Sequence, residues 1–539
     1  MPAAVQTLSS DAPAPAVARR SPFAAVRSLA GLTLGSRVLG LAREVMMAAA
    51  LGTGLVADAF FLAWMLPNLF RRLFGEGAFA AALVPVFVEA REGGDPDGAR
   101  RLVSAAVCRL ALGLCLLVLG GEALCWWLGS GAGQDLLAGW LSPAAALKAA
   151  AVLDLARLLL PYVVLICVAG LLGGALNALD RFSIPALAPS VFNGVWIVAL
   201  LVGTRLFPDA LSRVRFLAVS LVAGGVVQLL MHTRAMARAG VPLQPLLRAE
   251  PERLRRVQTL FCSLALGLAL FQLNAFLDGL IAYAFVSEGG VSALYYGNRL
   301  VQLPIGVLGV ALATAVFPEL TRLAKRGDDA GMWRVLDRGV ALGAFVALPA
   351  AAGLAVLAEP LVRVLFQRGA FDAESAARTA RVVLLLAPAV VAACVTPVIT
   401  RAFYAEEEVS TPVRTGALCV ALNLVLNLLL VGPMGEAGLA LATSTSQCAN
   451  LALQALLYRR RRVARGDAPR TLQTALSVLG CAALSAAMAL ATALAHRFAP
   501  GPAALRLGLA IAVGVCVYAG VALGLRLEPA RLLLARRRA

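Results

Sequence analysis

The residues best suited to chemistry in this chain are seven charged side chains inside two apolar stretches near its start. The stretches read LTLGSRVLGLAREVMMAAALG and ADAFFLAWMLPNLFRRLFGEGAFAAALVPVF. They contain Arg37, Arg43, Glu44, Asp58, Arg71, Arg72 and Glu76. A guanidinium is permanently charged, and its planar fork of donors matches phosphate oxygens. Because the arginines outnumber the carboxylates, and Arg299 adds a further cation in a later apolar stretch, we expect an anionic, phosphorylated ligand.

The spacing of these charges indicates that several of them share a helix face. Arg37 and Glu44 are seven residues apart and Arg43 is six from Arg37, so all three fall on about one side of a helix. Arg72 and Glu76 are four apart and can pair along a helix. The alternative is that these charges form salt bridges that only hold a helical bundle together.

The composition shows which elements must position these charges. Of 539 residues, 60% are hydrophobic and only 14% are charged, and the mean hydropathy is +0.83. A soluble globule of this size needs more polar surface, so the chain is predicted to be an all-α polytopic membrane protein. A bilayer core about 30 Å thick requires roughly 20 apolar residues per helix. Each charge at its centre costs on the order of 3 kcal/mol, so the charges must face water, protein or one another.

Fourteen transmembrane helices are predicted by counting apolar runs. Eleven runs are free of charge and lie at 158–179, 182–204, 216–233, 257–277, 300–318, 339–358, 382–400, 415–435, 437–458, 471–496 and 507–525. Three charged apolar stretches precede them, at about 26–50, 56–90 and 102–129.

The net charge of +18 follows membrane topology and does not indicate nucleic-acid binding. Basic clusters recur in every second predicted loop, for example at Arg100 and Arg101, at Arg322, Lys325 and Arg326, and at Arg459 to Arg462. Since positively charged loops stay on the cytoplasmic side, both termini are predicted to be cytoplasmic. Residues 1–22 have no apolar core and are expected to form a disordered cytoplasmic tail.

A faint internal duplication divides the predicted helices. The matched pairs are Pro161 and Pro388, Ser183 and Ser410, and Pro185 and Pro412 at an offset of 227, and Gln228 and Gln454, Arg234 and Arg460, and Gly240 and Gly466 at 226. Chance matches in a biased composition are the alternative. Two six-helix lobes related as parallel repeats are expected, with a central cavity between them. The predicted boundaries are 23–240 for the N-lobe, 241–466 for the C-lobe, 467–530 for a terminal helix pair and 531–539 for a basic cytoplasmic tail.

Other polar groups offer less chemistry. Ten cysteines occur singly and two histidines lack a visible partner, so no metal site and no cofactor are expected. Asn423, Asn427 and Thr443 can offer oxygens to a cation, although hydrogen bonding between helices is the favoured explanation of these residues. No carboxylate is visible in that group, and ion coupling through it is therefore doubtful.

Four segments resemble the lipid II flippase family of bacteria, the MurJ or MviN group. They read SRVLGLARE, DAFFLAWMLPNLFRRLFGEGAFAAALVPVF, DRFSIPALAPSVFN and LYYGNRLVQLPIGVLGVALATAVFPEL, and the likeness extends over nearly the whole chain. The resemblance implies the fold of the multidrug/oligosaccharidyl-lipid/polysaccharide exporter superfamily. It also implies a protein of the bacterial inner membrane that is not an enzyme and that moves undecaprenyl-diphosphate-linked peptidoglycan precursor to the outer leaflet by alternating access.

The resemblance assigns the important cavity arginines to Arg37, Arg43, Arg71, Arg72 and Arg299, and an aspartate of the second helix to Asp58. Glu44 stands where an aspartate is common. Asn298 stands where a carboxylate often precedes the arginine, so Arg299 is expected to lack a partner. We expect the diphosphate to bind Arg37, Arg43 and Arg299, while Glu44 and Asp58 balance their charge, with Glu76 beside them.

The expected partners are lipid II and membrane lipids, with the cell-wall synthesis machinery as a further candidate. Coupling to the membrane potential, Na⁺ or H⁺ stays open. The competing functions are export of another polysaccharide lipid, such as an O-antigen lipid, and export of multiple drugs. An arginine-rich cavity repels cationic drugs, but charge does not separate one lipid diphosphate from another.

Overall fold

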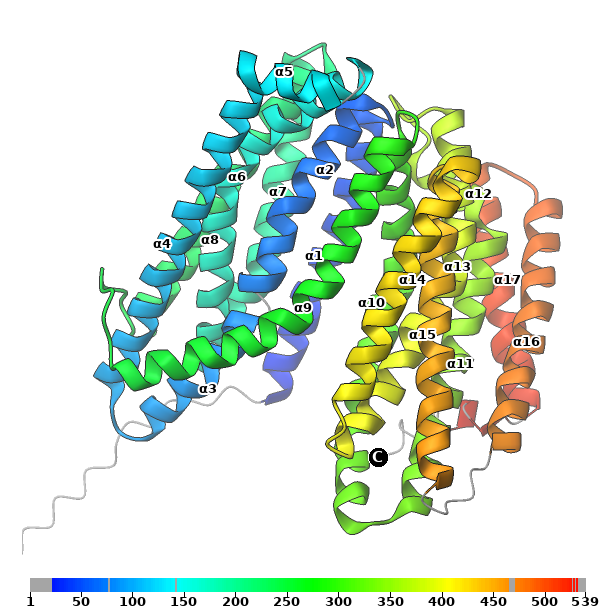
Figure 1. The fold of residues 1–539 in the computed structure, drawn as a ribbon. Coiled ribbons are helices and arrows are strands. Elements are labelled where there is room, and N and C mark those ends of the chain that lie inside the picture. Colours follow the sequence, from blue (N-terminus) through cyan, green and yellow to red (C-terminus); the bar gives the residue numbers. More distant parts are fainter. Residues whose placement is uncertain are drawn as a thin grey trace, which may run out of the picture.

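Helices account for nearly all of the described chain in the computed structural model (Figure 1). The structure describes residues 22–75, 78–140, 143–464 and 471–525, with a few residues up to 531, and these ranges contain no strand. Glu76, Gly466 and the two predicted tails lie largely or wholly outside them. The helices are α1 (Pro22–Leu51), α2 (Leu55–Phe70), η1 (Arg71–Gly75), α3 (Ala78–Glu92), α4 (Pro96–Gly129), α5 (Gly131–Trp140), α6 (Pro143–Ala178), α7 (Ser183–Leu206), α8 (Ala210–Arg238), α9 (Pro251–Phe285), α10 (Gly290–Arg326), α11 (Asp329–Val356), α12 (Ala358–Phe366), α13 (Ala373–Ala405), α14 (Ser410–Met434), α15 (Glu436–Ala464), α16 (Thr471–Phe498) and α17 (Ala503–Gly524).

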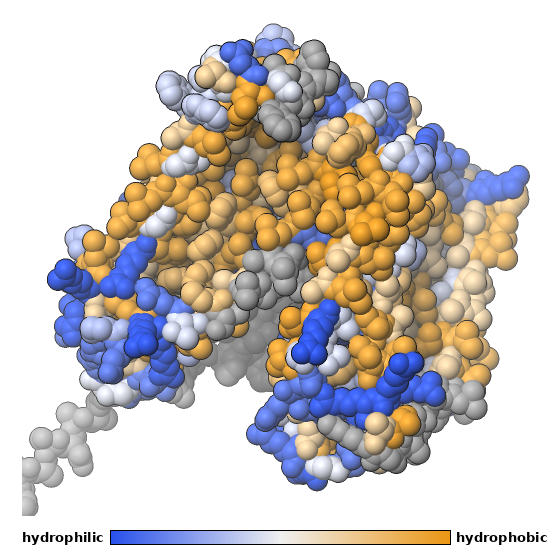
Figure 2. All heavy atoms as spheres, in the orientation of Figure 1, coloured by the Kyte–Doolittle hydropathy of each residue, from blue (hydrophilic) through white to orange (hydrophobic). Residues whose placement is uncertain are grey.

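The multi-span helical character is confirmed. Ten of the described helical stretches are long and apolar enough to cross a bilayer. Four others, α1, α9, α10 and α15, have 30, 35, 37 and 29 residues and overlap the apolar stretches predicted at 26–50, 257–277, 300–318 and 437–458. The total of fourteen transmembrane helices stays a prediction. Figure 2 shows a broad band of apolar side chains over this face, between polar upper and lower ends.

Two groups of helices stand beside each other in Figure 1. The N-terminal bundle contains α1 to α8 with η1, and the C-terminal bundle contains α10 to α15. α16 and α17 pack against each other and against α11, at the outer edge of the C-terminal bundle. In the figure, the first half of α9 runs beneath the N-terminal bundle, and its second half rises between the two bundles.

Two turns of identical form relate the bundles. Asp180 and Glu407, 227 residues apart, have φ angles of 57° and 60°, and they are the only described non-glycine residues with positive φ. Arg181 N donates to Leu176 O at 2.9 Å, and Glu408 N donates to Phe403 O at 3.0 Å, again at the offset of 227. The helices before and after the turns also end and begin at that offset. This geometry supports the duplication, while the domain boundaries remain predictions.

The second apolar stretch differs from the single helix expected over 56–90. It is divided into α2, η1 and α3, and η1 is one π-helical turn, Arg71–Gly75. Pro67, in the last turn of α2, removes a backbone donor just before the π-helical turn. A π-helical turn shifts the side chains that follow it around the helix axis and often occurs at functional sites. In this chain, η1 carries Arg71 and Arg72.

The beginning of α9 is fastened to the N-terminal bundle by ion pairs. Arg253 Nη1 lies 2.8 Å from Asp95 Oδ2, and Arg256 Nη1 lies 2.6 Å from Glu89 Oε2. The Arg253 guanidinium, together with the backbone amide of Gly98, holds the pKa of Asp95 below its usual value. Further along, α9 packs against α14 and α2. α9 therefore contacts both bundles.

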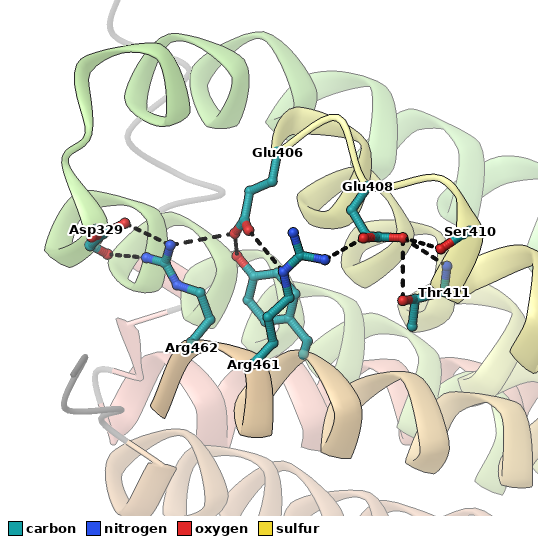
Figure 3. A network of polar contacts seen from close by, with 8 residues as sticks. Asp329, Glu406, Glu408, Ser410, Thr411, Arg461 and Arg462 are labelled. Atoms are coloured by element: carbon teal, nitrogen blue, oxygen red, sulfur yellow. Dashed lines mark hydrogen bonds and ion pairs between the residues drawn. The ribbon is translucent and has the colours of Figure 1, made fainter. Parts of the chain in front are cut away.

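The lower end of the C-terminal bundle is closed by a polar network (Figure 3). Arg462 of α15 is 2% exposed and lies 2.6 Å from Asp329 Oδ1 and 3.4 Å from Glu406 Oε1. Arg461 pairs with Glu408, which also accepts hydrogen bonds from Ser410 Oγ and Thr411 N. At the equivalent positions of the N-terminal bundle, Leu179 and Met236 pack in an apolar cluster. The two bundles thus close the same end by different means.

Candidate functional site

A cavity of about 260 Å³ lies between the two bundles. Figure 2 shows the surface hollowed between their polar lower ends. The wall of this central cavity comes mainly from α2, η1, α9, α10 and α15. Its polar lining residues are Asn68, Arg71, Arg72, Gln272, Asp278, Asn298, Arg299, Gln302 and Thr443. Three cations and one carboxylate give the lining a net positive charge.

One carboxylate joins the bundles beside this cavity. Glu44 of α1 is 4% exposed, and its Oε1 pairs with the guanidinium of Arg43. From α10, Arg299 Nε lies 3.3 Å from the same oxygen and Tyr295 Oη donates to it at 3.2 Å. The expectation that Arg299 lacks a partner is therefore wrong, because the adjacent bundle supplies the carboxylate that Asn298 does not. Two arginines share one buried carboxylate, and the group carries a net charge of +1.

Aromatic rings hold these arginines in place. The Arg43 guanidinium lies 4.5 Å from the centre of the Trp196 ring, and Arg43 Nη1 donates to Asn193 Oδ1 at 2.9 Å. Arg299 lies 4.8 Å from the centre of the Tyr295 ring and donates to its hydroxyl at 3.1 Å. Phe61 stacks on the Tyr295 ring at 3.9 Å. Rings attract cations, and these fixed planes reduce the rearrangement needed to present donors to an anion.

The other predicted arginines take separate places around the cavity. Arg71 Nη2 donates to Asn68 Oδ1 at 3.4 Å, and Arg72 Nη1 donates to Gln272 Oε1 of α9 at 3.2 Å. Arg37 is exposed and donates to the carbonyl of Gly306 of α10 at 3.2 Å, so it crosses between the bundles without lining the cavity. The predicted partner of Arg72, Glu76, lies outside the described residues.

Asp58 does not balance the cavity arginines, in contrast to the expectation. It lies near the start of α2, 13 residues from Arg71, which corresponds to about 20 Å along a helix. Its carboxylate accepts hydrogen bonds from Gly289 N at 2.7 Å and Ser292 N at 2.8 Å. Ser292 Oγ adds a third at 2.5 Å. Asp58 thus binds the beginning of α10, because the free amide groups of a helix N-terminus attract a carboxylate.

This contact belongs to a closure at the upper end of the two bundles. Thr53 Oγ1 lies 2.6 Å from Ser375 Oγ, and Ala370 N donates to Ala49 O at 2.8 Å. We call these two contacts, together with Asp58, Gly289 and Ser292, the gate. The cavity is consequently hollowed toward one end of the molecule and closed at the other.

Asn423, Asn427 and Thr443 meet a carboxylate that the sequence analysis missed. Asp278 of α9 accepts a hydrogen bond from Asn427 Nδ2 at 2.6 Å, and Asn427 Nδ2 also donates to Asn423 Oδ1 at 3.1 Å. Asn423 and Asn427 are 1% and 0% exposed, and Asn427 Oδ1 has no hydrogen-bond partner among the described residues. The objection that no carboxylate is present is therefore wrong. Asp278 and Asn274, four residues apart on α9, were the available signal.

Comparison with known families gives a consistent match. The family described as "Lipid II flippase MurJ" matches residues 47–508. A "Probable lipid II flippase MurJ" of Vibrio cholerae is 35% identical over 437 residues, which cover 80% of this chain and 81% of the relative. One of Rhizobium meliloti is 34% identical and covers 92% of this chain and 93% of the relative. A "Lipid II flippase MurJ" of Burkholderia cenocepacia is 31% identical, with 86% and 89% covered.

Solved structures show the same fold at lower identity. A lipid II flippase MurJ in an inward closed conformation superimposes with a TM-score of 0.72 at 21% identity, covering 91% of this chain and 96% of that chain. An inward-facing multidrug resistance transporter of the MATE family and MOP superfamily superimposes with a TM-score of 0.62 at 14% identity, covering 82% and 98%. The two-bundle fold is thus shared by transporters with different substrates.

Proposed function

The chain belongs to the lipid II flippase MurJ family, and from this membership we propose how its central cavity moves lipid II across the bacterial inner membrane. The protein is a multi-pass lipid II flippase, a transporter of the peptidoglycan precursor. Lipid II carries a charged diphosphate between a large polar head and an apolar prenyl tail. A flippase must therefore offer the diphosphate a charged path while the tail stays in lipid.

The topology that we propose has fourteen spans, with both termini in the cytoplasm. α1, α9, α10 and α15 are each at least 29 residues long, enough for a bilayer about 30 Å thick, and together with the ten apolar stretches they make fourteen. α5 and α12, with 10 and 9 residues, are too short to span. The positively charged loops then lie at the hollowed end, which we assign to the cytoplasm, and the gate lies at the periplasmic end.

In this proposal, the buried Arg43–Glu44–Arg299 group receives the diphosphate. Glu44 neutralises one of the two cations, so the empty site holds no cluster of unmatched charge. An entering diphosphate offers several acceptor oxygens to Arg299, Arg71 and Arg72 in the cavity and can replace Glu44 as their partner. The sharing of Glu44 between α1 and α10 carries this proposal, because its loss would remove the ion pair that links the two bundles beside the cavity.

Alternating access follows if loading weakens the gate. With the diphosphate bound, the Glu44 link between the bundles is broken at the cavity, and the bundles are free to close at the cytoplasmic end and separate at the periplasmic end. The Asp58 contacts with α10 must then break. Asp58 therefore serves the conformational change and does not bind the substrate.

We also propose that Asp278, Asn423, Asn427 and Thr443 form a cation site that couples transport to Na⁺ or H⁺. Carboxylate and amide oxygens are ligands that hard cations prefer. Asp278 and Thr443 line the central cavity as well, so a cation there would act directly on the charge of the substrate site. The membrane potential is a further energy source, since each charge that crosses 100 mV gains about 2.3 kcal/mol.

The function is tested in cells that express this chain and whose own flippase is acutely depleted, so that this chain is the only flippase left. Lipid II is then quantified in each leaflet by a reagent that reaches only the periplasmic side. Continued appearance of lipid II in the outer leaflet supports the function. Accumulation on the cytoplasmic side, with normal expression of this chain, contradicts it.

Export of another polysaccharide lipid or of drugs is the alternative that the superfamily fold allows. Two multidrug transporters of that superfamily are 14% identical to this chain, and at this identity the likeness shows the fold alone. The three arginines in the cavity lining disfavour cationic drugs by charge repulsion. Competition between lipid II and an O-antigen lipid for binding to the purified protein separates the two lipid substrates.

A further inference from the structure

An ion pair lies directly behind the gate in the C-terminal bundle. Arg378 of α13 donates to Glu436 at the start of α15 through Nε to Oε1 at 2.7 Å and through Nη2 to Oε2 at 3.1 Å. The two side chains are 15% and 12% exposed. A forked arginine–carboxylate pair of this kind fixes direction as well as distance. The guanidinium of Arg378 is therefore held in one orientation.

The other contacts of Arg378 reach the turn between α9 and α10. Nη1 donates to the carbonyl of Glu288 at 2.6 Å, and Nη2 donates to Ser287 Oγ at 3.2 Å. The next residue, Gly289, has a φ of +91°. A Cβ placed on it would lie 3.1 Å from Arg378 Nη1 and 3.1 Å from Thr53 Oγ1 of the opposite bundle. The turn is thus enclosed between Arg378 on one side and the N-terminal bundle on the other.

The same turn presents its amide groups to Asp58. Gly289 N and Ser292 N donate to opposite carboxylate oxygens, and the direction of both N–H groups depends on the conformation of residues 287–289. Arg378 binds Ser287 and Glu288, two of the three residues that set this conformation. It can therefore influence the gate through the turn.

We propose that Arg378, held by Glu436, is a positioning residue of the gate that fixes the α9–α10 turn so that Gly289 and Ser292 bind Asp58. This inference rests on the proposed function, since a gate matters only if the cavity opens alternately to each side. Neither Arg378 nor Glu436 lines the central cavity. The pair therefore acts on the equilibrium between conformations and leaves the binding surface for substrate unchanged.

The test uses a cysteine introduced by Ser375→Cys as a reporter of the gate. Ser375 is 3% exposed and contacts Thr53 across the bundles, so its position is reachable from the periplasm only when the gate opens. In intact cells, a membrane-impermeant maleimide is expected to label Ser375→Cys about tenfold faster when Arg378→Ala is also present than when Ser375→Cys is the only substitution. Glu436→Gln should give a smaller increase, and Arg378→Lys should fall between the parent and Arg378→Ala. The parent chain, with its ten native cysteines, supplies the background.

Arg363→Ala is the matched control, because Arg363 pairs with Glu359 on α12 at the same end of the bundle without contacting the turn. We expect it to label at the parental rate. A parental rate in both Arg378→Ala and Glu436→Gln overturns the proposal. So does an equal increase in Arg363→Ala, since any lost ion pair would then produce it.

A second reporter separates gate opening from general loosening. Asn298 is exposed in the central cavity, and a cysteine introduced by Asn298→Cys is labelled in inside-out vesicles from the cytoplasmic side. Opening the gate should slow this labelling in Arg378→Ala, whereas a loosened fold would accelerate labelling at both reporters and overturn the proposal. Faster labelling at Ser375→Cys with an unchanged rate at Asn298→Cys supports the positioning role and contradicts alternating access instead.

Discussion

Glu44 of α1 and Arg299 of α10 meet across the boundary between the two bundles, with Arg299 Nε 3.3 Å from Glu44 Oε1. Glu44 is 250 or more residues from its partners on α10, and its other oxygen, Oε2, is buried without a hydrogen-bond partner among the described residues. Because one oxygen is not engaged, this carboxylate can exchange one hydrogen-bond partner for another. It is therefore suited to a contact that forms and breaks during transport.

Removing the charge of Glu44 should destabilise the protein. Glu44→Gln leaves Arg43 and Arg299 side by side without their shared carboxylate, and breaking a buried ion pair costs about 3 kcal/mol. We expect a lower midpoint of thermal unfolding in detergent. Glu319→Gln, at an exposed position of α10, is the control and should unfold like the wild type. Equal unfolding midpoints for the wild type, Glu44→Gln and Glu319→Gln would show that the ion pairs of Glu44 contribute nothing to stability.

Arg72→Ala should weaken binding of lipid II to the purified protein by about tenfold, because one charge-assisted hydrogen bond to phosphate contributes about 1.5–3 kcal/mol and the cavity is open to water. Titration in nanodiscs measures this effect. Arg205→Ala removes an equal charge at an exposed position at the end of α7 and should bind like the wild type. A similar loss in both variants would attribute binding to overall charge instead of the cavity.

Asp278→Asn should abolish the response of transport to the coupling cation. The substitution keeps the size of the side chain and its contact distance to Asn427 but removes the negative charge that would attract a cation. Transport in vesicles is compared with Na⁺ replaced by K⁺, and with and without a pH gradient. The coupling proposal fails if the variant retains the full response, or if the wild type responds to neither gradient.

The polar network at the lower end of the C-terminal bundle predicts a pH dependence of stability. A hydrogen bond from Ser410, together with the Arg461 guanidinium, lowers the pKa of Glu408 from 4.5 to about 2 (Figure 3). Because the folded pKa is depressed, the stabilisation is complete above pH 4.5 and is lost as the pH falls from there toward 2. Glu408→Gln should therefore flatten the decline of the unfolding midpoint between pH 5 and pH 3.

Glu252→Gln, at an exposed position in the first turn of α9, is the control for this pH profile. It should retain the wild-type slope. Parallel profiles for the wild type and Glu408→Gln would show that Ser410 and Arg461 do not favour the charged form of Glu408.

The arginine set was predictable because charge inside an apolar helix is conspicuous in sequence. Arg43, Glu44 and Arg299 were expected at one site, and the structure brings them together. Which atoms meet was not predictable, since Glu44 and Arg299 come into contact only when two bundles pack. Glu44 was expected to balance the charge of Arg299, and Arg299 Nε does lie 3.3 Å from Glu44 Oε1, whereas the hydrogen bond from Tyr295 to the same carboxylate was not expected.

Asp278 and Asp58 show two other reasons for error. The apolar run at 257–277 ends one residue before Asp278, whereas α9 continues to Phe285, so the carboxylate was placed outside the span. Asp58 was expected to balance arginines because opposite charges attract, but its partners are backbone amides of α10. Free backbone amides cannot be recognised from the residue types. They can be located only once the position of the helix N-terminus is known.

In the proposed mechanism, Arg43 and Arg299 hold the lipid diphosphate during transport. The most direct measurement is the fraction of lipid II in the outer leaflet after acute depletion of the host flippase, in cells that express Arg299→Ala or Arg43→Ala at the wild-type level. We expect both variants to leave lipid II on the cytoplasmic side, while Arg205→Ala transports normally. Wild-type transport by Arg299→Ala and by Arg43→Ala would contradict it.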